Sequence, residues 1–317
     1  MEVTSQYNNY YQQNKPKVTN FRGYFTCPTK ELLSQASGID LVNFSGSNVS
    51  KAKRLLMPSL YKINDMPWAL AMNDVVESAV ANLNSNPHLT VTEILRGMSN
   101  NGRQRLKALS NNDREKLKHA EGFGILREDP QVIEFRNSYK EYESKVRQSI
   151  IKNKGIVYLT YTHKGKAIKL SQLSKDFSRY LSADSTNPNT YDVILETCPL
   201  ENAHIIVGQR LNKPFERIKF FKKQIDTGKL NKNNKILSNI IDNVSEIHWL
   251  ISQAWPYKRG SAALSDMTAK VIFDWLKIDI TPWNSNINPN IEALITPLPD
   301  FKKNYTSLFI RKPKWQN

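Results

Sequence analysis

The chain has 317 residues, of which 39% are hydrophobic and 23% are charged, and its formal net charge is +16. This length and composition are typical of a globular protein with one large domain or two small ones, and they exclude a disordered or fibrous chain. The positive charge favours anionic partners such as nucleic acids, acidic lipids, nucleotides or acidic proteins, without choosing among them. An excess of Lys spread along the chain beside many Asn residues is equally consistent with the base composition of the source genome.

The sequence shows no sign of membrane insertion or of acylation. No run of about 18 apolar residues is present, so we expect no transmembrane helix, and the N-terminal segment lacks the apolar centre of a secretory signal peptide. Glu2 stands where N-myristoylation requires a glycine. Cys27 and Cys198 have no partner at metal-ligand spacing, so we expect buried small apolar residues in a reducing compartment, and no metal.

The chain is expected to begin with a polar tail and then to form one domain. Residues 1–22 are rich in Asn, Gln and Tyr, which is typical of a flexible tail. A single domain is predicted over residues 23–317. Apolar residues at helical spacing begin at Asp65, in the run MPWALAMNDVVESAVANL.

Several local patterns predict where the next helices begin. Thr90 and Glu93 have the spacing of a capping box. Ser110 is expected to cap the following helix, and Asp129 followed by Pro130 is a strong signal for another helix start. The run after Pro130 has apolar residues at helical spacing, so a helix is predicted there.

A change of period predicts one β-hairpin between these helices. Residues 156–162 are β-branched and aromatic, the turn HKGK follows, and AIKL completes the pair. His163 lies at the turn, and we expect it to be solvent-exposed rather than catalytic. Further helices are predicted over roughly residues 200–211, 213–226, 234–254, 260–277 and 289–296. The fold class is therefore mainly α (α+β) with a small β-hairpin.

The basic stretch Lys213–Lys235 has two interpretations. Phe215 and Ile218 belong to an apolar stripe, with lysines on the other face. Such a helix can lie on an anionic membrane, but a packed helix with a solvated lysine face has the same pattern and is favoured. Nucleic acid is not an expected partner, because the chain has no zinc-finger spacing, RNP-type sequence or basic reading helix.

The stretch WPYKRGSAALSD, which begins at Trp255, predicts a tight elbow between two helices. Pro256 ends the first helix, and Gly260 with Ser261 begins the second, where the Ser261 hydroxyl is free to cap. The first N–H groups of a helix have no partner within it and carry the positive end of the helix dipole. Arg259 adds a forked donor suited to a diphosphate. A structural salt bridge of Arg259 is the equal alternative.

The elbow resembles the Fic motif HPFxxGNGR, in which a loop and a helix N-terminus hold nucleotide phosphates. The proline, the aromatic residue and the glycine are kept. Trp255 stands in place of the catalytic histidine, and Ala263 stands in place of the terminal arginine. Because the base is missing, ordinary AMP transfer is not expected. His248, two helical turns upstream on the same helix, is the nearest imidazole. It is more simply interpreted as a histidine of the hydrophobic core.

A longer resemblance connects the chain to the AvrB family of type III effectors. It runs through HWLISQAWPYKRGSAA, PNIEALI and FKKNYTSLF in order, from about Phe215 to Phe309, and is faint before residue 120. The resemblance implies a two-lobed helical fold related to Fic proteins. It also implies a protein glycosyltransferase that moves a deoxyhexose such as rhamnose from a nucleotide sugar to a host protein hydroxyl.

The resemblance also implies site residues. Arg259 matches the pocket arginine of the family, and Asn290, 31 residues later, matches its pocket aspartate. Asn212 is kept, Arg210 replaces a histidine, and the pocket threonine falls in the 121–130 loop without a matching residue. An amide cannot act as a base, so a different donor sugar, a different acceptor or a lost activity follows from these departures.

Three functions remain open from the sequence. The first is a secreted effector that acts in the host cytoplasm, with Arg259, Gly260, Ser261, Asn212 and Arg210 around a UDP- or dTDP-deoxyhexose and with Arg259 and Asn290 in catalysis. No tightly bound cofactor is expected for it. The second is a catalytically inactive module that binds a host protein, and the third is a Fic-variant nucleotidyltransferase with His248 as base. Peripheral contact with an anionic membrane also stays open.

Overall fold

The computed structural model describes most of the C-terminal two-thirds of the chain and parts of the rest. The described ranges are residues 18–21, 46–55, 66–111, 113–128, 132–135, parts of 146–174, 193–197, 200–284 and 287–316. Residues 18–21 of the predicted tail are described and form a strand, while the rest of the tail and both cysteines lie outside these ranges. Neither the rest of the tail nor the proposed division into a tail and one domain is therefore tested by the structure.

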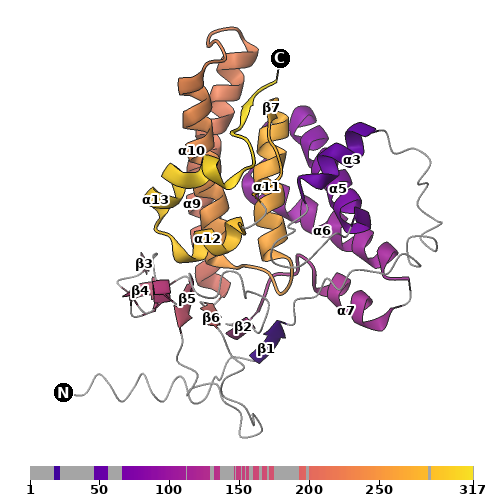
Figure 1. The fold of residues 1–317 in the computed structure, drawn as a ribbon, viewed down its shortest axis with the longest axis vertical. Coiled ribbons are helices and arrows are strands. Elements are labelled where there is room, and N and C mark those ends of the chain that lie inside the picture. The colour runs from indigo at the N-terminus through magenta and orange to yellow at the C-terminus, as the bar shows by residue number, and fades with distance from the viewer. Residues whose placement is uncertain are drawn as a thin grey trace, which may run out of the picture.

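The described part of the chain is mainly helical, as predicted (Figure 1). The helices are α3 (Gly46–Lys53), α5 (Met66–Ser85), α6 (Val91–Leu109), α7 (Arg114–Gly122), α9 (Leu200–Asp226), α10 (Asn234–Ala254), α11 (Ser261–Trp275), α12 (Pro289–Ile295), α13 (Leu298–Asn304) and the 3-10 turn η4 (Tyr305–Leu308). The strands are β1 (Val18–Phe21), β2 (Val132–Phe135), β3 (Thr160–His163), β4 (Lys166–Lys169), β5 (Ser171–Ser174), β6 (Val193–Thr197), β7 (Ile278–Asp279) and β8 (Lys314–Trp315).

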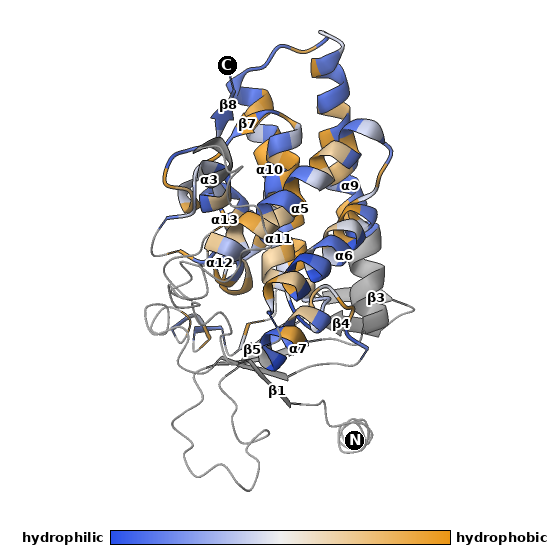
Figure 2. Cartoon of the chain, turned by 90° about the vertical axis from the view of Figure 1, so that its right-hand side faces the viewer, coloured by the Kyte–Doolittle hydropathy of each residue, from blue (hydrophilic) through white to orange (hydrophobic). Residues whose placement is uncertain are grey.

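The helices pack around α10 and α11. Helix α10 contacts α9 on one side and α11 on the other, α11 contacts α5, and α5 contacts α6. Figure 1 shows strands β1 to β6 gathered at one end of this bundle. In Figure 2 the apolar residues of α10 and α11 lie inside the bundle, while polar residues predominate on the outer turns. None of the helices in the described ranges is long and apolar enough to cross a membrane.

The predicted hairpin is confirmed, and a larger sheet accompanies it. Strands β3 and β4 pair antiparallel, with His163 opposite Lys166 across the turn. Four further strands form a sheet in the order β1-β2-β6-β5, in which β1 is parallel to β2 and the other neighbours are antiparallel. The helix predicted after Pro130 is wrong, because Val132–Phe135 is strand β2. Its pairing with β6 and β1 is a long-range contact that outweighs the local helical spacing.

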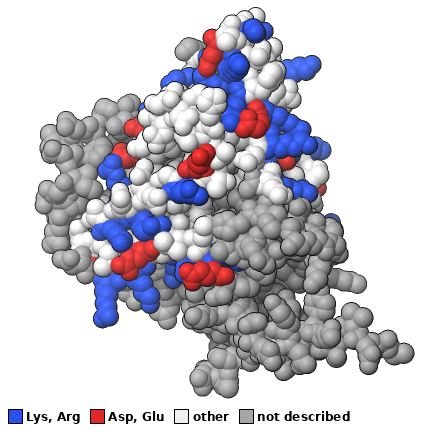
Figure 3. Space-filling model, turned by 180° about the vertical axis from the view of Figure 1, so that it is seen from behind, with Lys and Arg blue, Asp and Glu red and all other residues white. Residues whose placement is uncertain are grey.

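Helix α9 also differs from the prediction, since it is one helix of 27 residues instead of two. Pro214 lies inside it and removes one backbone hydrogen bond. Leu211, Phe215 and Ile218 lie on one face on both sides of the proline, and each is fully buried. Their burial holds the helix together, so the interpretation of the basic stretch as a packed helix is confirmed. Figure 3 shows the remaining Lys and Arg side chains of the rear face interspersed with fewer acidic ones.

The helix caps were predicted with mixed success. The backbone N–H of Thr90 donates to Glu93 Oε2 at 2.8 Å, and Thr90 Oγ1 accepts from the Glu93 N–H at 3.2 Å, so the capping box is confirmed. Ser110 is instead the C-cap residue of α6. Helix α7 is capped by Asp113, whose Oδ1 accepts from the Lys116 N–H at 3.1 Å. A carboxylate at the positive end of the helix dipole is the stronger cap.

A buried ion pair joins two residues on successive turns of α11. Lys270 Nζ donates to Asp266 Oδ1, which also accepts from Trp283 Nε1 at 2.7 Å, and both charged side chains are 1% exposed. The ammonium lies 4.9 Å from the centre of the Trp283 ring. Burial raises the pKa of Asp266 and lowers the pKa of Lys270, and the charge of each partner opposes the shift of the other.

Replacing Lys270 alone should destabilise the protein strongly. In Lys270→Met the Asp266 carboxylate stays buried without its cation, and such a change costs about 3–5 kcal/mol of unfolding free energy. Urea unfolding measures this loss. The control is Lys235→Met on the exposed first turn of α10, which should change the free energy by less than about 0.5 kcal/mol. Equal stability of the two variants would contradict this account of the pair.

Candidate functional site

The predicted elbow is present between α10 and α11. Helix α10 ends at Ala254, Trp255 takes a left-handed conformation with φ 44°, and Pro256 follows it. Helix α11 begins at Ser261 after Gly260, whose φ is 84°. The local signals of proline and glycine therefore located both helix ends correctly.

The loop after α7 holds the elbow by backbone hydrogen bonds. The Gly124 N–H donates to Arg259 O at 3.0 Å, and the Lys258 N–H donates to Ile125 O at 2.7 Å. Further along, the Arg127 N–H donates to Pro256 O at 3.1 Å. The elbow backbone is therefore fixed along its length by a segment more than 120 residues earlier in the chain.

Two glycines allow this close approach. A Cβ atom at Gly260 would lie 2.5 Å from Phe123 Cε2, and a Cβ atom at Gly124 would lie 2.3 Å from the Cβ of Ser99. Both glycines also have positive φ, 84° and 64°. Other residues would therefore be strained here by both the backbone conformation and the lack of space.

Arg127 makes the most buried contact of the elbow, and the sequence did not reveal it. Its side chain is 0% exposed. Nε donates to Trp255 O at 2.8 Å, and Nη2 donates to Ala254 O at 3.2 Å. The last carbonyls of a helix have no partner within it and carry the negative end of the dipole, so the guanidinium satisfies both requirements at the end of α10.

The predicted capping role of Ser261 is wrong. Its Oγ accepts from the Tyr257 N–H at 3.0 Å and donates to Tyr257 O at 3.3 Å, so the hydroxyl closes the elbow instead. The N-cap residue of α11 is Gly260, which makes no side-chain capping bond. The N-terminus of α11 is therefore not capped by a side chain at its N-cap position. Arg259, beside it, is partly exposed.

Asn290 lies in a buried polar network at the interface of α10, α11 and α12. It is 1% exposed, and its Oδ1 accepts from Ser252 Oγ at 2.9 Å. The Ser252 hydroxyl lies 3.2 Å from Ser265 Oγ, which donates to His248 O at 2.9 Å. Asn288 caps α12, since its Oδ1 accepts from the Asn290 N–H at 2.9 Å. The network joins the last turn of α10 to the second turn of α11.

His248 is a core histidine. It is fully buried, its Nδ1 lies 3.0 Å from Tyr305 Oη, and its ring packs against those of Trp283 and Phe301. Burial, with the nearby Lys270 charge, lowers the pKa of His248 to about 3. The Asn290 amide opposes this shift, although Nε2 of His248 has no partner within hydrogen-bond distance in the described part of the chain. A fully buried imidazole with so low a pKa is a weak base that is closed off from solvent, which does not fit the base of a Fic-variant nucleotidyltransferase.

The two remaining predicted residues lie on α9. Arg210 is exposed, and Asn212 is partly buried. Asn212 Oδ1 is a buried acceptor without a hydrogen-bond partner in the described part of the chain. The structure thus brings Arg259, Gly260 and Ser261 together at one turn, while Asn290 belongs to the helix interface behind it. In the described ranges, no group of three His, Cys, Asp or Glu side chains could hold a metal ion.

Replacing Arg127 should loosen the elbow. Arg127→Met leaves the carbonyls of Ala254 and Trp255 buried without donors, at about 1–3 kcal/mol for each unsatisfied group. Amide hydrogen exchange should become faster at Lys258 and Gly124, whose N–H groups join the elbow to the loop. Arg105→Met, which removes an exposed pair with Asp74, is the control. Unchanged exchange at the elbow would show that the backbone bonds suffice without the guanidinium.

His248 should make the protein sensitive to acid. The unfolded chain binds a proton at His248 below pH 6.5, whereas the folded chain stays neutral down to about pH 3. Its contribution to stability is therefore complete above pH 6.5 and is lost as the pH falls towards 3. Between pH 6.5 and 4 the wild type should lose on the order of 3 kcal/mol more unfolding free energy than His248→Gln. Parallel pH profiles of the two proteins would contradict the lowered pKa.

One family comparison identifies the C-terminal part of the chain. Residues 219–312 match the model of AvrB_AvrC, described as an avirulence protein family. This range contains the elbow, α11, Asn290 and the packing partners of His248. No curated protein matches the chain. The match covers the strongest part of the resemblance found in the sequence, so residues 219–312 are similar to the AvrB family of effectors.

Proposed function

We propose that the chain is a protein glycosyltransferase that binds the diphosphate of a nucleotide sugar at the elbow and transfers the sugar to a hydroxyl of a host protein. The avirulence family to which residues 219–312 are similar consists of effectors that are delivered into host cells. The target is accordingly a host protein, and the reaction takes place in the host cytoplasm. A UDP- or dTDP-deoxyhexose is the donor that we propose.

The observation that carries the proposal is the absence of a side-chain cap at Gly260. The first N–H groups of α11, a helix of 15 residues, are donors that an anion can accept. Arg259 precedes them directly and carries a forked, permanently charged donor. Ser261 cannot compete with a ligand for these donors, because its hydroxyl is bound to Tyr257.

The rigidity of the elbow supports the same conclusion. Backbone bonds from the loop at 124–127 hold the turn from outside, and Ser252 and Ser265 join its two helices from inside. A site that is ordered before the ligand arrives loses less conformational entropy on binding. In this proposal Arg259, Gly260 and Ser261 hold the diphosphate, and Arg210 and Asn212 lie towards the sugar side.

We assign Asn290 the task of orienting the acceptor side through Ser252, to which it is bound. A side-chain amide can donate and accept hydrogen bonds but cannot take a proton at neutral pH. The proton of the acceptor hydroxyl must therefore pass to another group, such as the donor phosphate itself. The same observation favours a second candidate, a module that binds a host protein without chemistry, because the family carboxylate is replaced by a buried neutral group.

Titration calorimetry with UDP- and dTDP-deoxyhexoses tests the elbow. We expect wild-type protein to bind one of them, and Arg259→Ala to bind at least tenfold more weakly, since a hydrogen bond to a charged group contributes about 1.5–3 kcal/mol. Arg311→Ala, an exposed arginine near the C-terminus, is the control and should bind as the wild type does. No binding by the wild type, or unchanged binding in Arg259→Ala, would overturn the elbow as a diphosphate site.

Mass spectrometry of a captured host protein separates the two candidates. A mass increase of one deoxyhexose that depends on Arg259 supports the transferase. Capture that is equal for wild type and Arg259→Ala, with no mass change, supports the binding module.

A further inference from the structure

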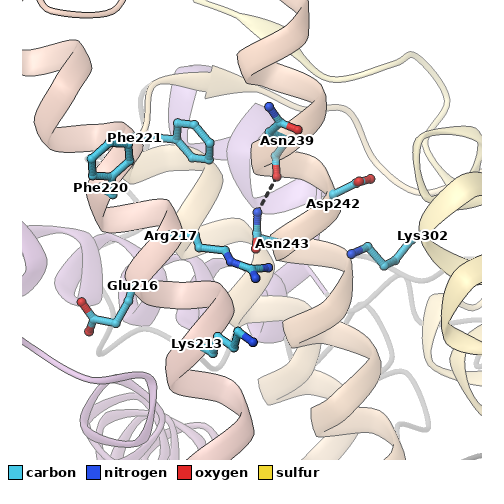
Figure 4. Close-up of a pocket in the computed structure, with 9 residues that line it drawn as sticks. All are labelled: Lys213, Glu216, Arg217, Phe220, Phe221, Asn239, Asp242, Asn243 and Lys302. Atoms are coloured by element: carbon cyan, nitrogen blue, oxygen red, sulfur yellow. Dashed lines mark hydrogen bonds between the residues drawn. The ribbon is translucent and has the colours of Figure 1, made fainter.

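A groove lies between α9 and α10, and Lys302 of α13 borders it on the α10 side (Figure 4). Its volume is about 740 Å³. It is lined by Lys213, Glu216, Arg217, Phe220, Phe221, Asn239, Asp242, Asn243 and Lys302. No residue of the elbow takes part in it, so its function is separate from the proposed sugar site.

The α9 wall of the groove is one face of the helix. Lys213, Arg217 and Phe220 follow one another at intervals of four and three residues, and Figure 4 shows them along one side of α9. At 1.5 Å per residue this wall is roughly 10 Å long, which is the length of about three residues of an extended peptide. The groove therefore has the size of a short peptide segment.

The upper end of this wall is aromatic. Phe220 is 58% exposed, and its ring packs edge to face against that of Phe221, with the ring centres 5.9 Å apart. Phe215 and Ile218 of the same helix are fully buried instead. An exposed aromatic ring in a concave surface is a favourable contact for an apolar side chain of a partner.

The lower end of the wall carries two cations, Lys213 and Arg217, whose contacts differ from those of the neighbouring lysines. Lys219 and Lys222 form ion pairs with Glu216 and Asp226. Both also lie over aromatic rings, at 5.5 Å from Phe215 and 5.7 Å from Trp275.

By contrast, no ion pair or hydrogen bond of the Lys213 or Arg217 side chain is found within the ranges that the structure describes. In Figure 4 both point into the groove from α9. Their charges are therefore available to acidic groups.

The floor of the groove has a buried acceptor. Asn243 is 6% exposed, and its Nδ2 donates to Asn239 O at 2.6 Å. Its Oδ1 is buried and has no hydrogen-bond partner in the described part of the chain. Because this oxygen is closed off from solvent, it belongs to the interior below the groove, and the contacts of a ligand must come from the exposed wall.

We propose that the groove between α9 and α10 binds a short acidic peptide segment of a partner protein. An apolar side chain of the segment packs on Phe220 and Phe221, and its carboxylates pair with Lys213 and Arg217. A flat lipid surface fits less well, because the cations lie in a concave groove. Lys302, at the far side, is already paired with Glu246 at 3.3 Å.

Phage display of random peptides on the immobilised full chain tests this proposal. We expect the selected peptides to combine Asp or Glu with Leu, Phe or Tyr. Fluorescein-labelled copies should bind Arg217→Glu and Phe220→Ser at least tenfold more weakly than the wild type. The control is Lys223→Glu, which makes the same charge change on an exposed residue of α9 outside the groove. All three residues are exposed, so thermal unfolding should show little change in stability.

Three results would overturn the proposal. The first is selection without enrichment of acidic residues. The second is equal weakening by Lys223→Glu and Arg217→Glu, which would indicate non-specific attraction by net charge. The third is Arg217-dependent binding to vesicles with 30% phosphatidylserine when no peptide is selected, which would make the groove a membrane contact. These variants should leave nucleotide-sugar binding unchanged, because none of them changes the elbow.

Discussion

The buried guanidinium of Arg127 is the contact on which the proposed site depends. A charged side chain that is 0% exposed is tolerated only where its donors are satisfied, and here the carbonyls at the end of α10 accept from it. The same residue donates its backbone N–H to Pro256 O. Arg127 thus ends one helix, fixes the chain that follows it, and joins the elbow to the loop after α7.

A second support acts on the elbow from the opposite side. The hydrogen bonds of Ser252 join the last turn of α10 to Asn290 on α12 and to Ser265 on α11. In this interior the pKa of His248 is lowered by burial and by Lys270. An aspartate at position 290 would need a cation or a proton there, since burying a lone charge is costly. The amide keeps the support of the elbow and removes the charge.

The features predicted correctly from the sequence are those that neighbouring residues determine, such as helix ends and turns. Pro256 and Gly260 located the elbow, Thr90 with Glu93 located the start of α6, and the spacing around His163 located the hairpin. The strand at Val132–Phe135 was missed because its partners β1 and β6 lie far away in the chain. Arg127 was missed for the same reason, as its acceptors lie 127 and 128 residues later. Its position beside Ile125 and Leu126, in an apolar run, was the one available signal.

The charged and polar groups of this basic chain include some that stabilise the fold and others that are open to a ligand. Most charges whose contacts are described here stabilise the fold: Lys270 is paired in the core, and Arg54 forms a bidentate pair with Asp274. At the elbow, Gly260 leaves a helix N-terminus without a side-chain cap, and in the α9–α10 groove Asn243 Oδ1 lacks a donor. The two are not equivalent, because N–H groups can donate to an anion whereas an amide oxygen can only accept. Core atoms such as Asn73 Oδ1 and His248 Nε2 also lack a partner in the described part of the chain, so the exposed cations, and not the buried Asn243 oxygen, mark the groove as a binding surface.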